Sequence, residues 1–139
     1  MSDSTPTIRW TEAYSVNVAT LDTQHQRLFV IINELNEALA SGEGGAVIDS
    51  VLRRLVEYAQ THFATEEKLL ADHKFPNLTG HRGGHDKFFQ SIAKFREDFR
   101  AGKPGVPVSL MLFLRDWLKE HILVHDKAYT GFLNSRGVR

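Results

Sequence analysis

The chain has 139 residues, of which 42% are hydrophobic and 24% charged, enough for one domain with a sizeable core. It carries 17 Lys and Arg residues against 17 Asp and Glu residues, with no run of like charge, so it lacks the basic footprint of a nucleic-acid-binding protein. It contains no cysteine, which excludes disulfides, thiolate catalysis and sulfur-ligated metals. Any metal must therefore be held by nitrogen and oxygen, and seven histidines are available.

No apolar run approaches the length of a membrane span, and Met1-Ser2-Asp3 opens neither a signal peptide nor a transit peptide. We therefore expect a cytoplasmic protein without a membrane span. Residues 1 to about 20 show no helical period and contain Pro6 and scattered apolar side chains. This pattern predicts an extended arm that packs on the body of the protein.

The first amphipathic stretch predicts a helix over residues 21–41. Thr20 or Asp22 would serve as its N-cap, and the glycine-containing segment 41–45 would end it. Its buried face is expected to carry Leu21, His25, Leu28, Ile32, Leu35 and Leu39.

Three further amphipathic stretches predict helices over residues 46–73, 80–101 and 107–128. No strand-like alternation competes with them, and the C-terminal tail is expected to fray after Asn134. Short loops join the four helices, so the sequence predicts a single all-α domain over 1–139, an up-down-up-down antiparallel four-helix bundle.

Histidines interrupt the apolar face of every predicted helix, and Glu66 interrupts the second as well. His25 and His62 each lie 17 residues from the turn between the first two helices, about 25 Å at 1.5 Å per residue. His85 and His121 lie 17 and 14 residues from the turn between the last two helices. The interruptions therefore converge at one depth of the bundle, which predicts a buried metal site.

The ligand types indicate more than one ion. The pairs His62 with Glu66 and His81 with His85 are each four residues apart, on one face of a helix. Five imidazoles and two carboxylates exceed the four ligands of a zinc site and suit two octahedral ions bridged by carboxylates. Iron is compatible with this set, and nickel, copper or a pair of zinc ions stay open.

The second carboxylate is ambiguous in the fourth helix. His125 follows His121 at the regular spacing of four, whereas Asp126 lies about 140° off the face of His121 in an ideal α-helix. Periodicity therefore favours His125, while the charge of two cations favours Asp126. A local π-helical turn would bring Asp126 inward.

The order of His25, His62-x-x-x-Glu66, His81-x-x-x-His85 and His121-x-x-x-x-Asp126 resembles the hemerythrin family, specifically its single-domain bacterial members. The resemblance extends from Trp10 through Asp22-x-x-His25 to Tyr129 and favours Asp126, with His125 as a neighbour. It implies that one iron is held by His81, His85 and His121, and the other by His25 and His62, with oxygen binding at an open position of the second iron. Glu66, Asp126 and an oxo or hydroxo group would bridge the two irons. The oxygen pocket of the family corresponds here to Leu28, Phe63, Trp117, Leu118, Ile122 and Tyr129.

This resemblance implies reversible dioxygen binding by a non-enzymatic carrier, storage or delivery protein. The alternatives are oxygen or redox sensing with a separate partner, di-iron peroxidase or oxidase chemistry, and nitric-oxide or iron detoxification. No Glu-x-x-His motif, the signature of di-iron carboxylate enzymes, occurs in the chain. We expect a monomer, because no apolar helix face is left over, and His73 is expected at a helix end or on the surface.

Two adjacent glycines, Gly83 and Gly84, separate His81 from His85. Each costs roughly 0.8–1 kcal/mol in a helix relative to alanine. We therefore hypothesise that metal binding offsets this cost and that the metal-free protein is locally disordered over residues 80–85.

Overall fold

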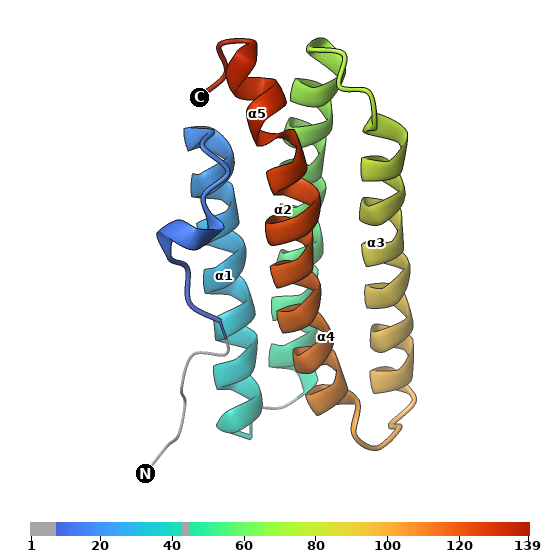
Figure 1. The fold of residues 1–139 in the computed structure, drawn as a ribbon. Helices are drawn as coiled ribbons and strands as arrows, with labels where there is room; N and C mark the ends of the chain where they lie inside the picture. Colours follow the sequence, from blue (N-terminus) through green and yellow to red (C-terminus); the bar gives the residue numbers. More distant parts are fainter. Residues whose placement is uncertain (1–7, 43–44) are drawn as a thin grey trace.

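The computed structural model of the protein describes residues 8–42 and 45–139. Its long elements form an antiparallel bundle of helical rods, and the described residues contain no strand (Figure 1). The fourth rod is continuous through a helix, a π-helical segment and a final helix. The predicted all-α four-helix bundle is confirmed. The elements are η1 (Glu12–Tyr14), α1 (Ala19–Ala40), α2 (Gly45–Asp72), α3 (Leu78–Arg100), α4 (Val106–Glu120), η2 (His121–Asp126) and α5 (Lys127–Ser135).

The start of α1 differs from the prediction. Its N-cap is Val18, so the expectation that Thr20 or Asp22 caps the helix is wrong. The Asp22 carboxylate instead accepts hydrogen bonds from the backbone N–H of Val16 at 2.8 Å and the hydroxyl of Ser15 at 2.6 Å. A carboxylate in the first turn also interacts favourably with the helix dipole. Asp22 therefore fastens the arm to the beginning of α1.

The N-terminal arm packs on the bundle, as predicted, over its described residues. Ile8, Val16 and Val18 are buried, and a short 3-10 turn, η1, interrupts the extended backbone. The Asn33 side chain of α1 accepts a hydrogen bond from the Ile8 N–H and donates one to the Ile8 carbonyl oxygen. The part of the predicted arm over 1–7, and residues 43–44 of the first predicted turn, lie outside the described residues.

The last helix continues to Ser135, past the predicted boundary at residue 128. Gly137 has a φ of +82°, and the Val138 N–H bonds the Leu133 carbonyl oxygen at 3.0 Å. The Asn134 side chain donates to the Val138 carbonyl oxygen at 2.7 Å. These bonds form a glycine-dependent C-terminal cap, which argues against fraying after Asn134.

Apolar side chains of the four rods form the core, but the fourth rod also exposes several. Val108, Leu112, Leu123 and Val124 are 66%, 46%, 41% and 59% exposed. This differs from the expectation that no apolar helix face is left over. Among the described residues, no helix combines the length and the apolarity needed to cross a bilayer.

The two glycines between His81 and His85 lie inside α3, which is helical from Leu78 to Arg100. A Cβ atom at Gly83 or Gly84 would meet no other atom within 4 Å. A Cβ at Gly80 would lie 2.6 Å from the Asn77 side-chain oxygen. Packing therefore does not require glycine at 83 or 84.

We expect Gly83→Ala and Gly84→Ala each to raise the free energy of unfolding by about 0.5–1 kcal/mol, because alanine loses less backbone entropy in a helix. Chemical denaturation would measure the gain. Gly80→Ala is the matched control and should gain less, since the Asn77 side chain must move. A loss of stability at both 83 and 84 would contradict this reading.

In the metal-free protein, we expect the amides of residues 80–85 to exchange hydrogen faster than the rest of α3, because these residues combine three glycines with two histidines. Hydrogen exchange with mass-spectrometric or NMR detection would test this. Protection equal to that of the remainder of α3 would rule out the local disorder.

Candidate metal centre

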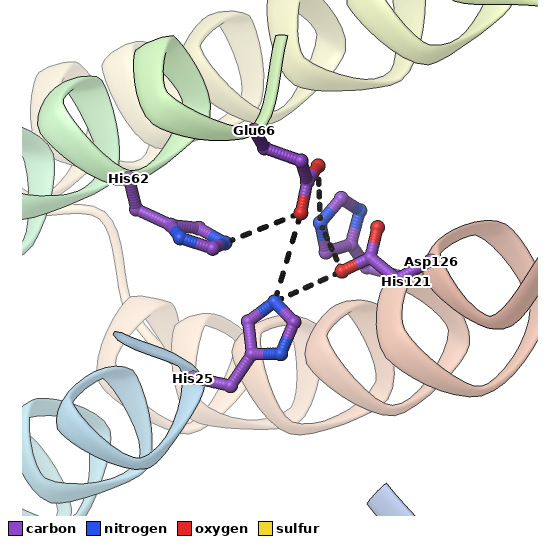
Figure 2. A group of neighbouring side chains, drawn as sticks. All are labelled: His25, His62, Glu66, His121 and Asp126. Carbon is purple, nitrogen blue, oxygen red and sulfur yellow. Dashed lines mark ion pairs between the residues drawn. The ribbon is translucent and has the colours of Figure 1, made fainter. Parts of the chain in front are cut away.

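All seven predicted ligand residues lie together in the centre of the bundle. They come from α1, α2, α3 and η2, and Figure 2 shows five of them pointing toward one another. The exposed fraction is 8% or less for every one. The residues are His25, His62, Glu66, His81, His85, His121 and Asp126.

The carboxylate of Glu66 divides the five imidazoles into two groups. Its Oε1 atom lies near three Nε2 atoms, at 2.5 Å from His81, 3.0 Å from His85 and 3.8 Å from His121. Its Oε2 atom lies near the other two, at 3.7 Å from His25 and 3.5 Å from His62. One carboxylate thus presents one oxygen to a three-histidine group (His81, His85, His121) and the other to a two-histidine group (His25, His62).

Asp126 also faces both groups. Its Oδ1 atom lies 3.1 Å from Nε2 of His81, a member of the three-histidine group. Its Oδ2 atom lies 3.0 Å from Nε2 of His25 and 3.1 Å from Nε2 of His121. The two carboxylates therefore have the geometry of a pair that spans two neighbouring ion positions.

A π-helical segment, η2, carries Asp126 to this position. The Lys127 N–H bonds the Ile122 carbonyl oxygen, five residues back, and so widens the turn. The Asp126 side chain is fully buried, while that of His125 is 58% exposed. The predicted π-helical turn is thus confirmed, and it turns Asp126 rather than His125 inward. His73 lies just beyond the end of α2 and is partly exposed, as expected.

Several buried polar atoms of the cluster have no hydrogen-bond partner among the described residues. They are Nδ1 and Nε2 of His25, Nε2 of His62 and of His121, and both carboxylate oxygens of Asp126. Buried polar atoms are nearly always hydrogen-bonded, so this convergence needs an explanation. Nitrogen and oxygen ligands about 2.1 Å from one ion, at right angles, lie about 3 Å apart. The measured separations between these ring nitrogens and carboxylate oxygens lie around that value, so the residues fit a metal ion.

The donor atoms suffice for two ions. Five residues, His25, His62, Glu66, His121 and Asp126, each offer one atom within 4.8 Å of the others. A second set shares Glu66 and His121 and adds His81 and His85. Glu66 belongs to both sets and has two oxygens, so it can serve two adjacent ions, whereas the Nε2 atom of His121 can bind one of them.

The two buried carboxylates change the pKa values of the neighbouring imidazoles. Burial lowers the pKa of His25, but Asp126 and Glu66 outweigh burial and raise that pKa to about 9. The same two carboxylates raise the pKa of His81 to about 10 against burial. Burial dominates at His62 and lowers its pKa to about 3. Bound cations would take the place of the protons on such imidazoles.

The carboxyl groups show the complementary effect. Burial raises the pKa of Glu66, but the neighbouring imidazoles of His25, His81 and His85 hold that pKa well below its ordinary value. Burial also raises the pKa of Asp126, but His121 and His25 outweigh it and lower that pKa. Both carboxylates of the centre are therefore stabilised as anions, the form that binds a metal.

Aromatic side chains surround the three-histidine group. The Phe63 ring stacks on His85 with centroids 3.7 Å apart, and the Trp117 ring stacks on His121 at 4.5 Å. The Tyr129 hydroxyl donates a hydrogen bond to Glu66 Oε2 at 2.9 Å. Leu28, Leu118 and Ile122, the other expected oxygen-pocket residues, are buried. The assignment of these six side chains to an oxygen pocket stays a prediction.

Two polar side chains at the edge of the cluster were missed from the sequence. His62 Nδ1 donates to Gln24 Oε1 at 2.6 Å, and His85 Nδ1 donates to Glu67 Oε2 at 2.7 Å. The general preference of ligand imidazoles for an acceptor at the second ring nitrogen indicates that such partners exist. Which residue supplies them depends on contacts between helices that the sequence pattern does not define.

Comparison with known proteins agrees with this geometry. The family model described as "Hemerythrin HHE cation binding domain" matches residues 16–133. The bacteriohemerythrin of Methylococcus capsulatus (strain Bath) is 33% identical over 127 residues, which cover 91% of this chain and 96% of that protein. The bacteriohemerythrin of Stenotrophomonas maltophilia is 32% identical over 120 residues, covering 86% of this chain and 77% of that protein.

A solved structure, described as wild-type hemerythrin, has a TM-score of 0.80 and 31% identity to this chain. The alignment covers 91% of this chain and 97% of that one. With a family model over most of its length and relatives above 30% identity, this chain belongs to the hemerythrin family, whose members bind oxygen at a non-haem di-iron centre.

Proposed function

We propose that this protein binds dioxygen reversibly at a di-iron centre and serves to carry, store or deliver oxygen. The observation that carries the proposal is the position of Glu66, a fully buried carboxylate with one oxygen toward three histidines and the other toward two. When bound, a di-iron centre supplies two electrons, one from each iron, to dioxygen.

The proposed ligands follow the two histidine groups. The first iron would be held by His81, His85 and His121, and the second by His25 and His62. Glu66 and Asp126 would bridge both irons, since each carboxylate lies close to imidazoles of both groups. An oxo or hydroxo group would complete the bridge.

The unequal groups give the two irons unequal roles. The two-histidine group offers one imidazole fewer, so an iron held there would have fewer protein ligands and would leave room for dioxygen. Leu28, Leu118 and Ile122 are buried side chains without polar atoms, and we assign to them the task of keeping water and protons away from that position. The proposed oxygen chemistry requires no general acid or base from the protein.

The ligand set supports a carrier rather than an oxidase. Di-iron carboxylate enzymes use Glu-x-x-His motifs and four glutamates in a bundle, whereas this chain has no such motif and two carboxylates at its centre. Fewer anionic ligands stabilise high-valent iron less. This reasoning favours binding of oxygen over its activation.

The first test combines iron content with a visible absorption spectrum. Anaerobically reduced protein should contain two irons per chain and gain a visible band on exposure to oxygen. The same band should disappear on purging with argon. Irreversible conversion to a ferric spectrum without that band, with peroxide consumed, would favour the enzyme or redox-sensor alternative. Zinc in place of iron would overturn both interpretations.

A pair of variants tests the assignment in η2. Asp126→Ala should lower iron affinity at least tenfold, because it removes a proposed bridging carboxylate from both metal positions. His125→Ala, one residue away and exposed, should keep two irons and the oxygen-dependent band. Iron analysis after dialysis, with circular dichroism to check folding, would measure both. An equal loss of bound iron in the two variants would contradict the proposed role of Asp126 as a ligand.

Tyr129→Phe tests the hydroxyl that donates to Glu66. The variant should lower the free energy of unfolding by about 1–3 kcal/mol, because a buried carboxylate oxygen loses its donor. Denaturant unfolding of the metal-free protein would measure this, because there no bound ion contacts that oxygen. Unchanged stability would show that the Tyr129 hydroxyl does not stabilise the buried Glu66 carboxylate.

A further inference from the structure

Two side chains outside the ligand set reach ring nitrogens of the histidines at the centre. Gln24 of α1 accepts a hydrogen bond from His62 Nδ1 at 2.6 Å, and Glu67 of α2 accepts one from His85 Nδ1 at 2.7 Å. An amide oxygen and a carboxylate oxygen can only accept, so Nδ1 of each ring carries the donated hydrogen, while Nε2 of each ring faces Glu66. Each hydrogen bond at Nδ1 therefore changes the electron density of an imidazole ring whose Nε2 atom is a proposed metal ligand.

The two acceptors differ in charge although they have nearly the same shape. Gln24 offers a neutral amide oxygen to His62, which belongs to the two-histidine group. Glu67 offers a carboxylate oxygen to His85, which belongs to the three-histidine group. The second oxygen of Glu67 accepts a hydrogen bond from Arg82 Nε at 3.1 Å, which fixes the orientation of the carboxylate.

An acceptor at the second ring nitrogen changes the imidazole as a ligand. It orients the ring and increases its basicity, and a charged acceptor does so more strongly than a neutral one. A more electron-donating imidazole stabilises ferric over ferrous iron. The Glu67 carboxylate would therefore stabilise the ferric state of the three-histidine iron. The neutral Gln24 amide would leave the ferrous state of the two-histidine iron more stable by comparison.

We propose that Gln24 and Glu67 are positioning residues that set the difference in reduction potential between the two irons. Glu67 lowers the potential of the iron bound by His85, and Gln24 keeps that of the iron bound by His62 higher. This inference rests on the proposed di-iron function, and it assigns to this pair the preference for ferrous iron at the oxygen-binding position.

The exchange of amide and carboxylate at these two positions tests the proposal with little change in shape. Glu67→Gln should raise the potential of the three-histidine iron, and Gln24→Glu should lower that of the two-histidine iron. Each variant should change its one-electron equilibrium about tenfold, or about 59 mV. Each substitution should bring the reduction potentials of the two one-electron steps closer together. The double variant should bring them closest, and it has the same net charge as the wild type.

Spectroelectrochemical titration of the iron-loaded protein would measure the two steps, and Mössbauer spectra of the half-reduced state would identify the ferrous iron. Glu57→Gln is the matched control, because it removes one negative charge from an exposed position of the same helix. It should leave the separation between the two steps unchanged.

A purely structural role for Glu67 would lower iron content or thermal stability without narrowing the separation, and that result would overturn the proposal. If Glu67→Gln lost iron, Gln24→Glu would test the proposal by itself, because it adds a carboxylate acceptor instead of removing one. An unchanged difference between the two reduction potentials in Gln24→Glu would also overturn the proposal. Wild-type protein that fails to bind two irons would instead refute the proposed function.

Discussion

The burial of two carboxylates, Glu66 and Asp126, is the constraint on which the rest of the structure depends. Both are fully excluded from solvent in the middle of the bundle, where each loses hydration and repels the other. Five imidazoles reach them from all four rods, and their Nε2 atoms surround the carboxylate oxygens. Such a core is stable as a packed interior only when positive charge occupies it. Metal cations can supply this positive charge better than protons, because a proton neutralises one group whereas a metal ion binds several ligands at once. The bundle and its centre therefore depend on each other.

The π-helical segment has consequences beyond Asp126. In an ideal α-helix, Tyr129 would lie about 80° from the face of His121, but one inserted residue brings it to within about 20°. The same widened turn that buries Asp126 thus also directs Tyr129 at the centre, where its hydroxyl donates to Glu66. The helix that follows holds the arm, because Thr130 donates to the Val16 carbonyl oxygen and Asn134 to that of Asn17. One local irregularity therefore positions a carboxylate, a phenol and the contacts of the N-terminal arm.

Much of the fold and of the ligand set follows from periodicity, because apolar spacing locates helices and equal depths along them predict convergence. Asp126 is an exception, because periodicity favours His125, and charge and the family resemblance favour Asp126. Three further features did not follow from the sequence. Asp22 looks like an N-cap by residue type, but the arm brings the Val16 N–H to its carboxylate. The C-terminal cap depends on the positive φ of Gly137, which the sequence allows without requiring. The acceptors Gln24 and Glu67 depend on how α1 and α3 are rotated against α2, which no single-helix pattern contains. Sequence reasoning is strong within one helix and weak for contacts between helices.

The three-histidine group and the two-histidine group differ in the number of imidazoles and in the acceptors at their outer ring nitrogens. Both differences favour ferric iron at the three-histidine group. The three-histidine group has the additional nitrogen donor and also the charged acceptor, Glu67. Arg82 could cancel that charge, but its side chain is 55% exposed against 25% for Glu67. Solvent and salt screen an exposed pair of this kind strongly. His85, in contrast, is buried and donates to Glu67 at the shorter distance of 2.7 Å. The carboxylate therefore keeps most of its influence on the imidazole, and the asymmetry between the two proposed iron positions extends past the ligands themselves.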